Sequence, residues 1–155
     1  MAAGKTIEFA DNVLQYLVSG LDLPSNSGGL YVALLSALPA GTAPYSGEDL
    51  ASVEVSSGNG YRAALSTNKF GAITTVNEAR EVVNADSNNG EVNFSTAPGN
   101  FSVSGYALTY SQTSVQADTY VAYELFTGAD ASKGRNVIQG DTIKINVNGL
   151  KIREK

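Results

Sequence analysis

The chain carries the apolar run Leu30-Tyr31-Val32-Ala33-Leu34-Leu35 in its first third. Nearly every position is apolar, and a short run of this kind between turn residues predicts a strand buried on both faces. A stretch of small and acidic residues, 36–50, follows the run, and after it comes Asn59-Gly60-Tyr61-Arg62-Ala63-Ala64-Leu65. We expect residues 61–65 to form a further strand behind a glycine turn.

The second half of the chain is rich in short alternating segments. Strands are predicted at 103–110, at 120–126 and at 142–147, where the apolar residues follow a strict period of two. Asn148-Gly149 has the form of a type I′ hairpin turn that leads into a final strand. Shorter strands are predicted at 53–55 and 92–94. Together these segments predict a mainly β fold, an antiparallel β-sandwich or jelly-roll-like domain that spans residues 1–155 as one unit.

The N-terminal segment 6–19 predicts one amphipathic α-helix. Its apolar residues recur at helical spacing and form a single stripe, made of Ile7, Ala10, Val13, Leu14, Leu17 and Val18. Thr6 is suited to cap the start of this helix, and Gly20 is suited to end it. The stripe must be buried, and we expect it to pack within its own chain, with packing on a neighbouring subunit as the alternative. Val13 and Leu17 are the candidate interface residues on the stripe.

Composition restricts the functions that are open to the chain. With 155 residues and 43% hydrophobic content, the chain is long enough to build one core. The absence of Cys and His removes disulfides, thiolate metal sites and the commonest general base. The net charge is −5 and the Lys and Arg residues are scattered, whereas binding to phosphates needs clustered positive charge. We therefore expect no nucleic-acid partner. No segment reaches the roughly 18 apolar residues of a membrane span, and the N-terminus lacks the pattern of a signal peptide, so we expect no membrane partner.

The sequence contains only weak matches to the motifs of catalytic, phosphate-binding and metal-binding sites. A Ser–His–Asp arrangement is impossible without His, and segment 128–134 has the wrong spacing for a phosphate-binding loop. Segment 86–91 is similar to the start of a calcium loop, but a plain Asn-Gly turn explains it. The carboxylates considered for glycoside cleavage are Glu48, Asp49, Glu91 and Glu124, and we expect Glu124 to face solvent. The sequence therefore predicts a protein that is not an enzyme, with no catalytic, cofactor-binding or metal-binding residues.

Three more candidate contact residues lie outside the helix. Segment 39–49 holds two Pro and two Gly without periodicity and predicts a long loop, a feature that usually serves function. Tyr45 in this loop is predicted to be exposed and to contact a partner, whereas Tyr106 and Tyr123 are predicted to be core residues. The charged C-terminal tail contributes Lys151 and Arg153 as further interface candidates.

The order of these segments along the chain is more informative than any single segment. After the N-terminal helix and the strand Leu30–Leu35 come, in order, Gly58-Asn59-Gly60-Tyr61-Arg62, Phe101-Ser102-Val103-Ser104-Gly105-Tyr106-Ala107-Leu108, Tyr123-Glu124-Leu125-Phe126 and Gly140-Asp141-Thr142-Ile143. This order resembles a family of small virion proteins of tailed bacteriophages, the tail-fibre-like or decoration proteins. The resemblance extends along nearly the whole chain.

The resemblance implies a β-sandwich-type virion component without catalytic residues, assembled in the cytoplasm of the host bacterium. We expect three copies of the chain to form a homotrimer. The homotrimer would contact other virion proteins, either the major capsid protein or tail and baseplate proteins. Its role would be that of a capsid decoration or cement protein, or of a tail-fibre or baseplate-associated protein. The alternative is a carbohydrate- or receptor-binding module of the phage adhesion apparatus, which predicts an exposed patch rich in Tyr.

Overall fold

The computed structural model of the chain describes residues 2–20, 29–56, 59–65, 70–77, 79–84, 90–146 and 149–154. Its helices are α1 (Ile7–Ser19), α2 (Gly47–Val53) and the 3-10 helices η2 (Ala117–Thr119) and η3 (Gly128–Lys133). Its strands are β1 (Ala2–Lys5), β2 (Leu30–Leu35), β3 (Arg62–Leu65), β4 (Thr74–Val76), β5 (Ala79–Val83), β6 (Val92–Asn93), β7 (Phe101–Val103), β8 (Gly105–Thr109), β9 (Tyr120–Leu125), β10 (Arg135–Val137), β11 (Lys144–Ile145) and β12 (Lys151–Glu154). The fold is mainly β, with 34% strand and 22% helix, which confirms the predicted class. Among the described residues, none of the helices has the length and apolar content that crossing a bilayer requires.

An antiparallel sheet with the strand order β1-β9-β8-β2-β3 forms the centre of the fold. β2 lies between β8 and β3, and its Val32 stands opposite Leu108 on one side and Ala63 on the other. This position buries residues 32–35, as the apolar run predicts. Gly105 allows β8 and β9 to approach closely, because a Cβ at this residue would lie 2.4 Å from the carbonyl oxygen of Glu124.

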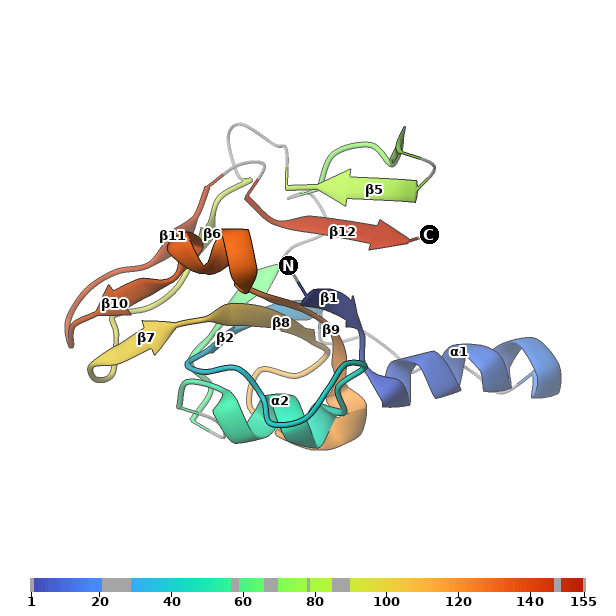
Figure 1. Ribbon diagram of the computed structural model, residues 1–155, viewed down its shortest axis with the longest axis horizontal. Coiled ribbons are helices and arrows are strands. Elements are labelled where there is room, and N and C mark those ends of the chain that lie inside the picture. Colours follow the sequence, from blue (N-terminus) through green and yellow to red (C-terminus); the bar gives the residue numbers. More distant parts are fainter. Residues whose placement is uncertain are drawn as a thin grey trace.

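Each face of the central sheet has its own apolar core. The upper face in Figure 1 is covered by the strand pairs β6–β11 and β7–β10. Its core includes Val32, Leu34, Tyr106 and Leu108 from the sheet and Val92, Phe94, Val137 and Leu150 from the covering segments. The lower face is covered by α2, and its core includes Ala33, Leu35, Ala107, Tyr123, Leu125 and, from α2, Leu50. Two β layers that share a core make the fold sandwich-like, as predicted.

The predicted N-terminal helix is confirmed. Thr6 is the N-cap of α1, and its hydroxyl oxygen accepts a hydrogen bond from the backbone N–H of Phe9. Gly20 ends the helix in the left-handed conformation with a φ of 66°. The core positions predicted for Tyr106 and Tyr123 are confirmed as well, since both side chains are buried.

The prediction that segment 39–49 is a loop throughout is wrong at its C-terminal end, where α2 begins at Gly47. A capping box starts this helix. The Ser46 hydroxyl accepts a hydrogen bond from the N–H of Asp49 at 3.1 Å, and the Asp49 carboxylate accepts one from the N–H of Ser46 at 2.9 Å. The strand predicted at 53–55 is reduced to an isolated bridge between Leu35 and Glu54, because α2 occupies the chain up to Val53.

The predicted C-terminal hairpin is wrong. β11 pairs with β6, whereas β12 pairs with β5 in a separate sheet of order β12-β5-β4. The strand predicted at 142–147 is also shorter, and Val147 and Asn148 lie outside the described residues. An alternating pattern shows which side chains share a face but not which strand lies alongside, so it could not reveal this pairing.

Candidate assembly site

The first turn of α1 is fixed to the central sheet. Thr6 is fully buried, and its hydroxyl donates a hydrogen bond to the carbonyl oxygen of Tyr120 at 2.6 Å. The backbone N–H of Thr6 donates to the carbonyl oxygen of Val121 at 3.0 Å. The rings of Phe9 and Tyr110 also pack with their centroids 6.4 Å apart. These contacts set the position at which α1 leaves the body of the protein.

The segment before α2 holds α1 from a second side. The N–H of Ile7 donates a hydrogen bond to the carbonyl oxygen of Tyr45 at 3.2 Å, and the N–H of Gly47 donates to the Glu8 carboxylate at 2.9 Å. Glu8 thus lies at the start of α2, where exposed N–H groups favour a negative charge. Two elements that are distant in sequence therefore fix the direction of α1.

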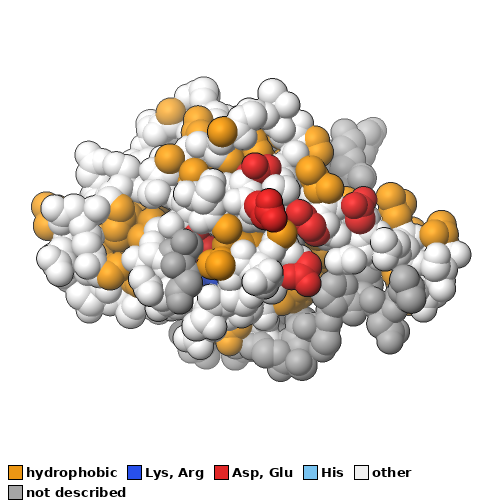
Figure 2. Space-filling view, turned by 90° about the horizontal axis from the view of Figure 1, so that it is seen from below, with side chains coloured by type: hydrophobic (Ala, Val, Ile, Leu, Met, Phe, Trp, Pro, Cys, Tyr) orange, Lys and Arg blue, Asp and Glu red, His pale blue; other side chains and the backbone are white. Residues whose placement is uncertain are grey.

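Among the residues that the structure describes, none supports the second half of α1 in this way. The helix contains no buried residue, and Leu14, Leu17 and Val18 are 58%, 70% and 80% exposed. Figure 1 shows α1 projecting from the body, and Figure 2 shows apolar side chains on its surface. The expectation that the stripe packs within its own chain is therefore wrong. The candidate Val13 is half-buried in the middle of the helix, whereas the candidate Leu17 is exposed.

Tyr45 does not lie where the sequence predicted. Its side chain is only 9% exposed, and its ring packs edge-on against Tyr123 with the centroids 5.4 Å apart. The prediction that Tyr45 is exposed is therefore wrong, because the segment around it folds back onto the lower core beside α2. Tyr45 instead contributes its carbonyl oxygen to the base of α1.

The charged tail forms strand β12 and is not a free end. Lys151 stands opposite Val83 and Arg153 opposite Glu81 in the antiparallel pairing with β5. The side chains of Lys151 and Arg153 lie outside the described part of the structure. Their role as interface candidates stays a prediction.

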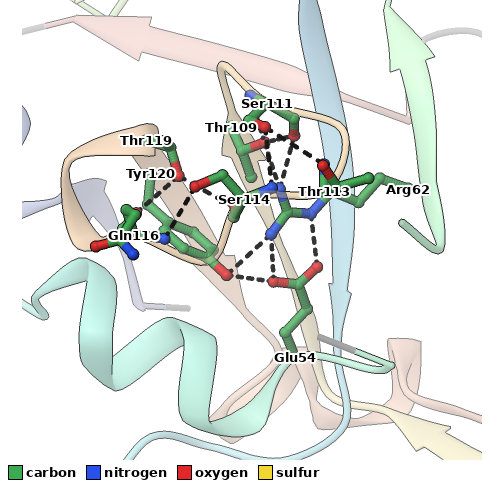
Figure 3. A network of polar contacts seen from close by, with 9 residues as sticks. All are labelled: Glu54, Arg62, Thr109, Ser111, Thr113, Ser114, Gln116, Thr119 and Tyr120. Atoms are coloured by element: carbon green, nitrogen blue, oxygen red, sulfur yellow. Dashed lines mark hydrogen bonds and ion pairs between the residues drawn. The ribbon is translucent and has the colours of Figure 1, made fainter. Parts of the chain in front are cut away.

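A buried polar network joins the end of α2, β3, β9 and the loop between β8 and β9 (Figure 3). Arg62 on β3 and Glu54 after α2 form a two-pronged ion pair, with Nε to Oε1 at 2.7 Å and Nη2 to Oε2 at 2.8 Å. Both side chains are 1% exposed. Tyr120 accepts a hydrogen bond from Arg62 at 3.1 Å and donates its hydroxyl proton to Glu54. Two charges are therefore buried, but each is paired and hydrogen-bonded, as burial of charge requires.

The same guanidinium organises the loop between β8 and β9. Its Nη1 donates to the carbonyl oxygens of Ser111 at 2.6 Å and Ser114 at 2.9 Å, and to the Thr109 hydroxyl at 3.2 Å. The loop is tightened further where the Ser111 hydroxyl oxygen accepts the N–H of Ser114 at 3.0 Å. Arg62 thus ties the loop to Tyr120, whose carbonyl oxygen holds Thr6 at the start of α1.

Tyr120 and Arg62 keep one protonation state each at neutral pH. Burial and the hydrogen bond to Glu54 raise the pKa of Tyr120, so its hydroxyl stays neutral. Burial acts to lower the pKa of Arg62, but the hydrogen bonds and the charge of Glu54 outweigh it and the pKa lies above its usual value. The network therefore serves as a rigid support for neighbouring elements, and sequence reasoning missed it. The available signal was an Arg within the otherwise apolar segment 61–65.

A cleft of about 570 Å³ opens on the other side of the molecule, between the central sheet and the β10–β11 segments. Its apolar lining is formed by Leu34, Val103, Tyr106, Phe126, Val137, Ile143 and Ile145. Its charged lining is formed by Lys133, Arg135, Lys144 and Asp141. The volume and the mixture of apolar walls with a few charged groups are typical of a binding cleft.

Arg135 and Lys144 line the cleft and differ in their hydrogen-bond and ion-pair partners. Arg135 donates hydrogen bonds to the carbonyl oxygens of Ser132 and Gly134, at 2.7 and 2.9 Å. Lys144 forms an ion pair with Glu91 at 3.0 Å, in which both side chains are about half exposed. A pair this exposed is weak, so Lys144 remains available to a partner.

Acidic side chains gather on the opposite, lower face of the molecule, as Figure 2 shows. The first turns of α1, α2 and η2 contribute Glu8, Glu48, Asp49 and Asp118. The molecule therefore separates its charges, with acidic groups at the helices and several cations at the cleft.

The remaining sequence candidates have local structural contacts. Asp49 belongs to the capping box of α2, and Glu91 pairs with Lys144. Glu124 is partly buried on β9, where its carboxylate accepts a hydrogen bond from the Tyr106 hydroxyl, so the expectation that it simply faces solvent is wrong. Segment 128–134 contains η3, and residues 86–89 of the calcium-like segment lie outside the described residues.

Comparison of the chain with protein-family models and with curated proteins finds no match.

Proposed function

We propose that the chain is a non-enzymatic structural protein that assembles with copies of itself through α1. The observation that carries this proposal is the exposed apolar surface at the end of α1, formed by Leu14, Leu17 and Val18. A single 13-residue helix is only marginally stable in water, and its stability in proteins comes from packing of its apolar face. The buried polar contacts at Thr6 hold the helix in a projecting position, where a second protein molecule can cover it.

The setting that we propose is the virion of a tailed bacteriophage, on the basis of the order of sequence segments given above. The protein would decorate or cement the capsid surface, or belong to the tail fibre or baseplate, as a homotrimer that contacts the neighbouring virion proteins. An obligate interface of this kind buries more than about 2,000 Å². Virions that lack the protein would have unstable heads if it cements the capsid, and intact heads with failed attachment if it serves the tail.

The experiment that tests self-assembly is the molar mass of the purified chain, measured by light scattering over a range of concentrations. We expect a trimer for the wild type and a monomer for Leu17→Glu, since a charge would then lie in the contact. Ser19→Glu adds the same charge at an exposed position on the side of α1 that faces away from Leu17, and it is the matched control. A wild-type chain that stays monomeric at all concentrations would contradict the proposal.

The receptor-binding alternative loses the residue on which it was based. Tyr45 is buried, so a binding defect in Tyr45→Ala would come from damage to the lower core. We therefore keep assembly as the proposed function.

A further inference from the structure

We infer that the cleft between the central sheet and β10–β11 is the surface that receives α1 of a second copy, so that copies join head to tail. This inference rests on the proposed function, because it names the surface that the projecting helix contacts. The occupant is the exposed face of α1, and the receptor is the cleft lined by Tyr106, Phe126 and Ile143.

The two surfaces lie at opposite ends of the molecule. In Figure 1, α1 extends on one side, and β7 and β10 lie at the other end. Residues of β7 and β10 line the cleft. The helix of one copy therefore does not reach its own cleft and leaves it open to another copy. A contact between different surfaces of identical subunits either closes into a ring or continues as a filament. A ring of three copies corresponds to the proposed trimer.

The exposed ridge of α1 and the walls of the cleft are both apolar. Ile7, Leu14 and Val18 are exposed and recur at spacings of seven and four residues, which places them along one ridge of α1. The cleft offers apolar walls of aliphatic and aromatic side chains. An amphipathic helix that lays such a ridge into an apolar groove is a common form of recognition between proteins.

The charges of the two surfaces are complementary. α1 contains Glu8 and Asp11 but neither Lys nor Arg, and Asp11 is exposed on the same ridge between Ile7 and Leu14. The cleft is lined by Lys133, Arg135 and Lys144 and by the carboxylate of Asp141, whose Oδ2 accepts the N–H of Ile138 at 3.0 Å. Lys144 is paired with Glu91, so Arg135 is the cation on which the charge argument depends. Among the described residues, Arg135 has no carboxylate partner, so a carboxylate from α1 would supply one. Complementary charge favours this orientation over helix-to-helix contact, which would bring acidic residues together.

Disulfide trapping tests the contact directly, because the chain has no Cys of its own. Leu14→Cys marks the exposed ridge of α1, and Thr142→Cys marks the cleft. We expect a mixture of the two variants to form a crosslinked dimer on mild oxidation, whereas Leu14→Cys alone stays uncrosslinked. Crosslinking of Leu14→Cys to itself would overturn the inference and retain assembly through α1. A trimeric wild type without crosslinking in the mixture would also overturn it, and a monomeric wild type would overturn the proposed function as well.

Complementation provides a second, independent test. Leu14→Glu damages the exposed ridge of α1 and Arg135→Glu damages the cleft, so we expect each variant to be monomeric when alone. Mixed together, they should form a one-to-one complex, because one variant keeps an intact cleft and the other keeps an intact α1. A mixture that stays monomeric, while circular dichroism shows both variants to be folded, would overturn the head-to-tail contact.

Discussion

At the scale of single residues, Arg62 places a positive charge in the interior, with its side chain 1% exposed. Its ion pair with Glu54 is not by itself a strong source of stability, because the cost of desolvation offsets much of the attraction. What the pair does provide is a fixed geometry, since the guanidinium also binds the carbonyl oxygens of Ser111 and Ser114. The loop between β8 and β9 and the start of α1 both depend on this geometry.

Removal of one partner from this pair should be costly. We expect Glu54→Gln to lower the free energy of unfolding by about 3–5 kcal/mol, because it leaves the buried charge of Arg62 without a counter-charge. The double variant Glu54→Leu with Arg62→Met should lose less stability than the summed losses of Glu54→Leu alone and Arg62→Met alone. Urea unfolding at neutral pH measures these values. The exposed pair provides the control, since Glu91→Gln should cost less than about 1 kcal/mol. Additive losses in the double variant would contradict the prediction.

Two buried tyrosines offer a matched comparison. The Tyr120 hydroxyl is hydrogen-bonded to Glu54 and Arg62, whereas the Tyr61 hydroxyl is buried without a hydrogen-bond partner among the described residues. Tyr120→Phe should lower the free energy of unfolding by about 1–3 kcal/mol, because it leaves charged groups unsatisfied. Tyr61→Phe should leave stability unchanged or raise it, since an unsatisfied polar group is removed. Equal losses in the two variants, measured by urea unfolding, would contradict this assignment.

Alkaline pH should destabilise the fold through the same residue. The pKa of Tyr120 is raised in the folded protein by burial and by Glu54, whereas the unfolded chain titrates near the usual value of 10.0. Above that pH the unfolded state binds fewer protons than the folded state, so the free energy of unfolding falls as pH rises. The stabilising contribution is complete below pH 10 and is lost progressively above it. Unfolding curves should show a shallower fall for Tyr120→Phe than for the wild type, and identical slopes would contradict the prediction.

At the scale of elements, local signals predicted α1 and β2 well. Thr6, Gly20 and the apolar run Leu30–Leu35 act through neighbouring residues, so the sequence alone contains what determines them. The capping box at Ser46 and Asp49 was equally local and was overlooked. Burial of Tyr45 could not be predicted, because it depends on Tyr123, which lies far along the chain.

The candidate site was predicted only in part, for the same reason. Leu17 could be named from helical periodicity, since the stripe is a property of one segment. The ion pair of Glu54 and Arg62 depends on how α2 and β3 meet, and the cleft depends on the placement of β10 and β11 against the central sheet. Contacts between elements that are distant in sequence cannot be predicted from the pattern of any single segment.

The contact between α2 and η2 should depend on Gly47. A Cβ at this residue would lie 2.1 Å from the carbonyl oxygen of Ala117, so the two helices could not keep their present distance. We expect Gly47→Ala to lower the free energy of unfolding by about 1–3 kcal/mol, because a side chain is forced into a packed site. Gly99→Ala is the control, since a Cβ there meets nothing within 4 Å. Thermal unfolding of both variants measures the difference, and equal stability would contradict the role assigned to Gly47.

At the scale of the whole molecule, the separation of charge matters more than the net value of −5. Acidic groups lie in the first turns of α1, α2 and η2, and cations line the cleft near β10 and β11. Copies arranged head to tail bring opposite charges together at every contact, whereas copies that meet through α1 alone bring like charges together. The charge distribution therefore favours a ring or filament in which the copies are arranged head to tail.

Salt should distinguish these two arrangements. Charges at the edge of an interface are screened as ionic strength rises, and the screening length falls from about 10 Å at 0.1 M to about 3 Å at 1 M. A head-to-tail contact that pairs Asp11 with Arg135 should therefore weaken as NaCl is raised over this range, as measured by light scattering. Asp11→Asn should reduce this salt dependence, and Asp118→Asn on η2 should leave it unchanged. Apolar contact between α1 helices would instead hold or strengthen at high salt, because like charges would then be screened, and that result would contradict the head-to-tail arrangement.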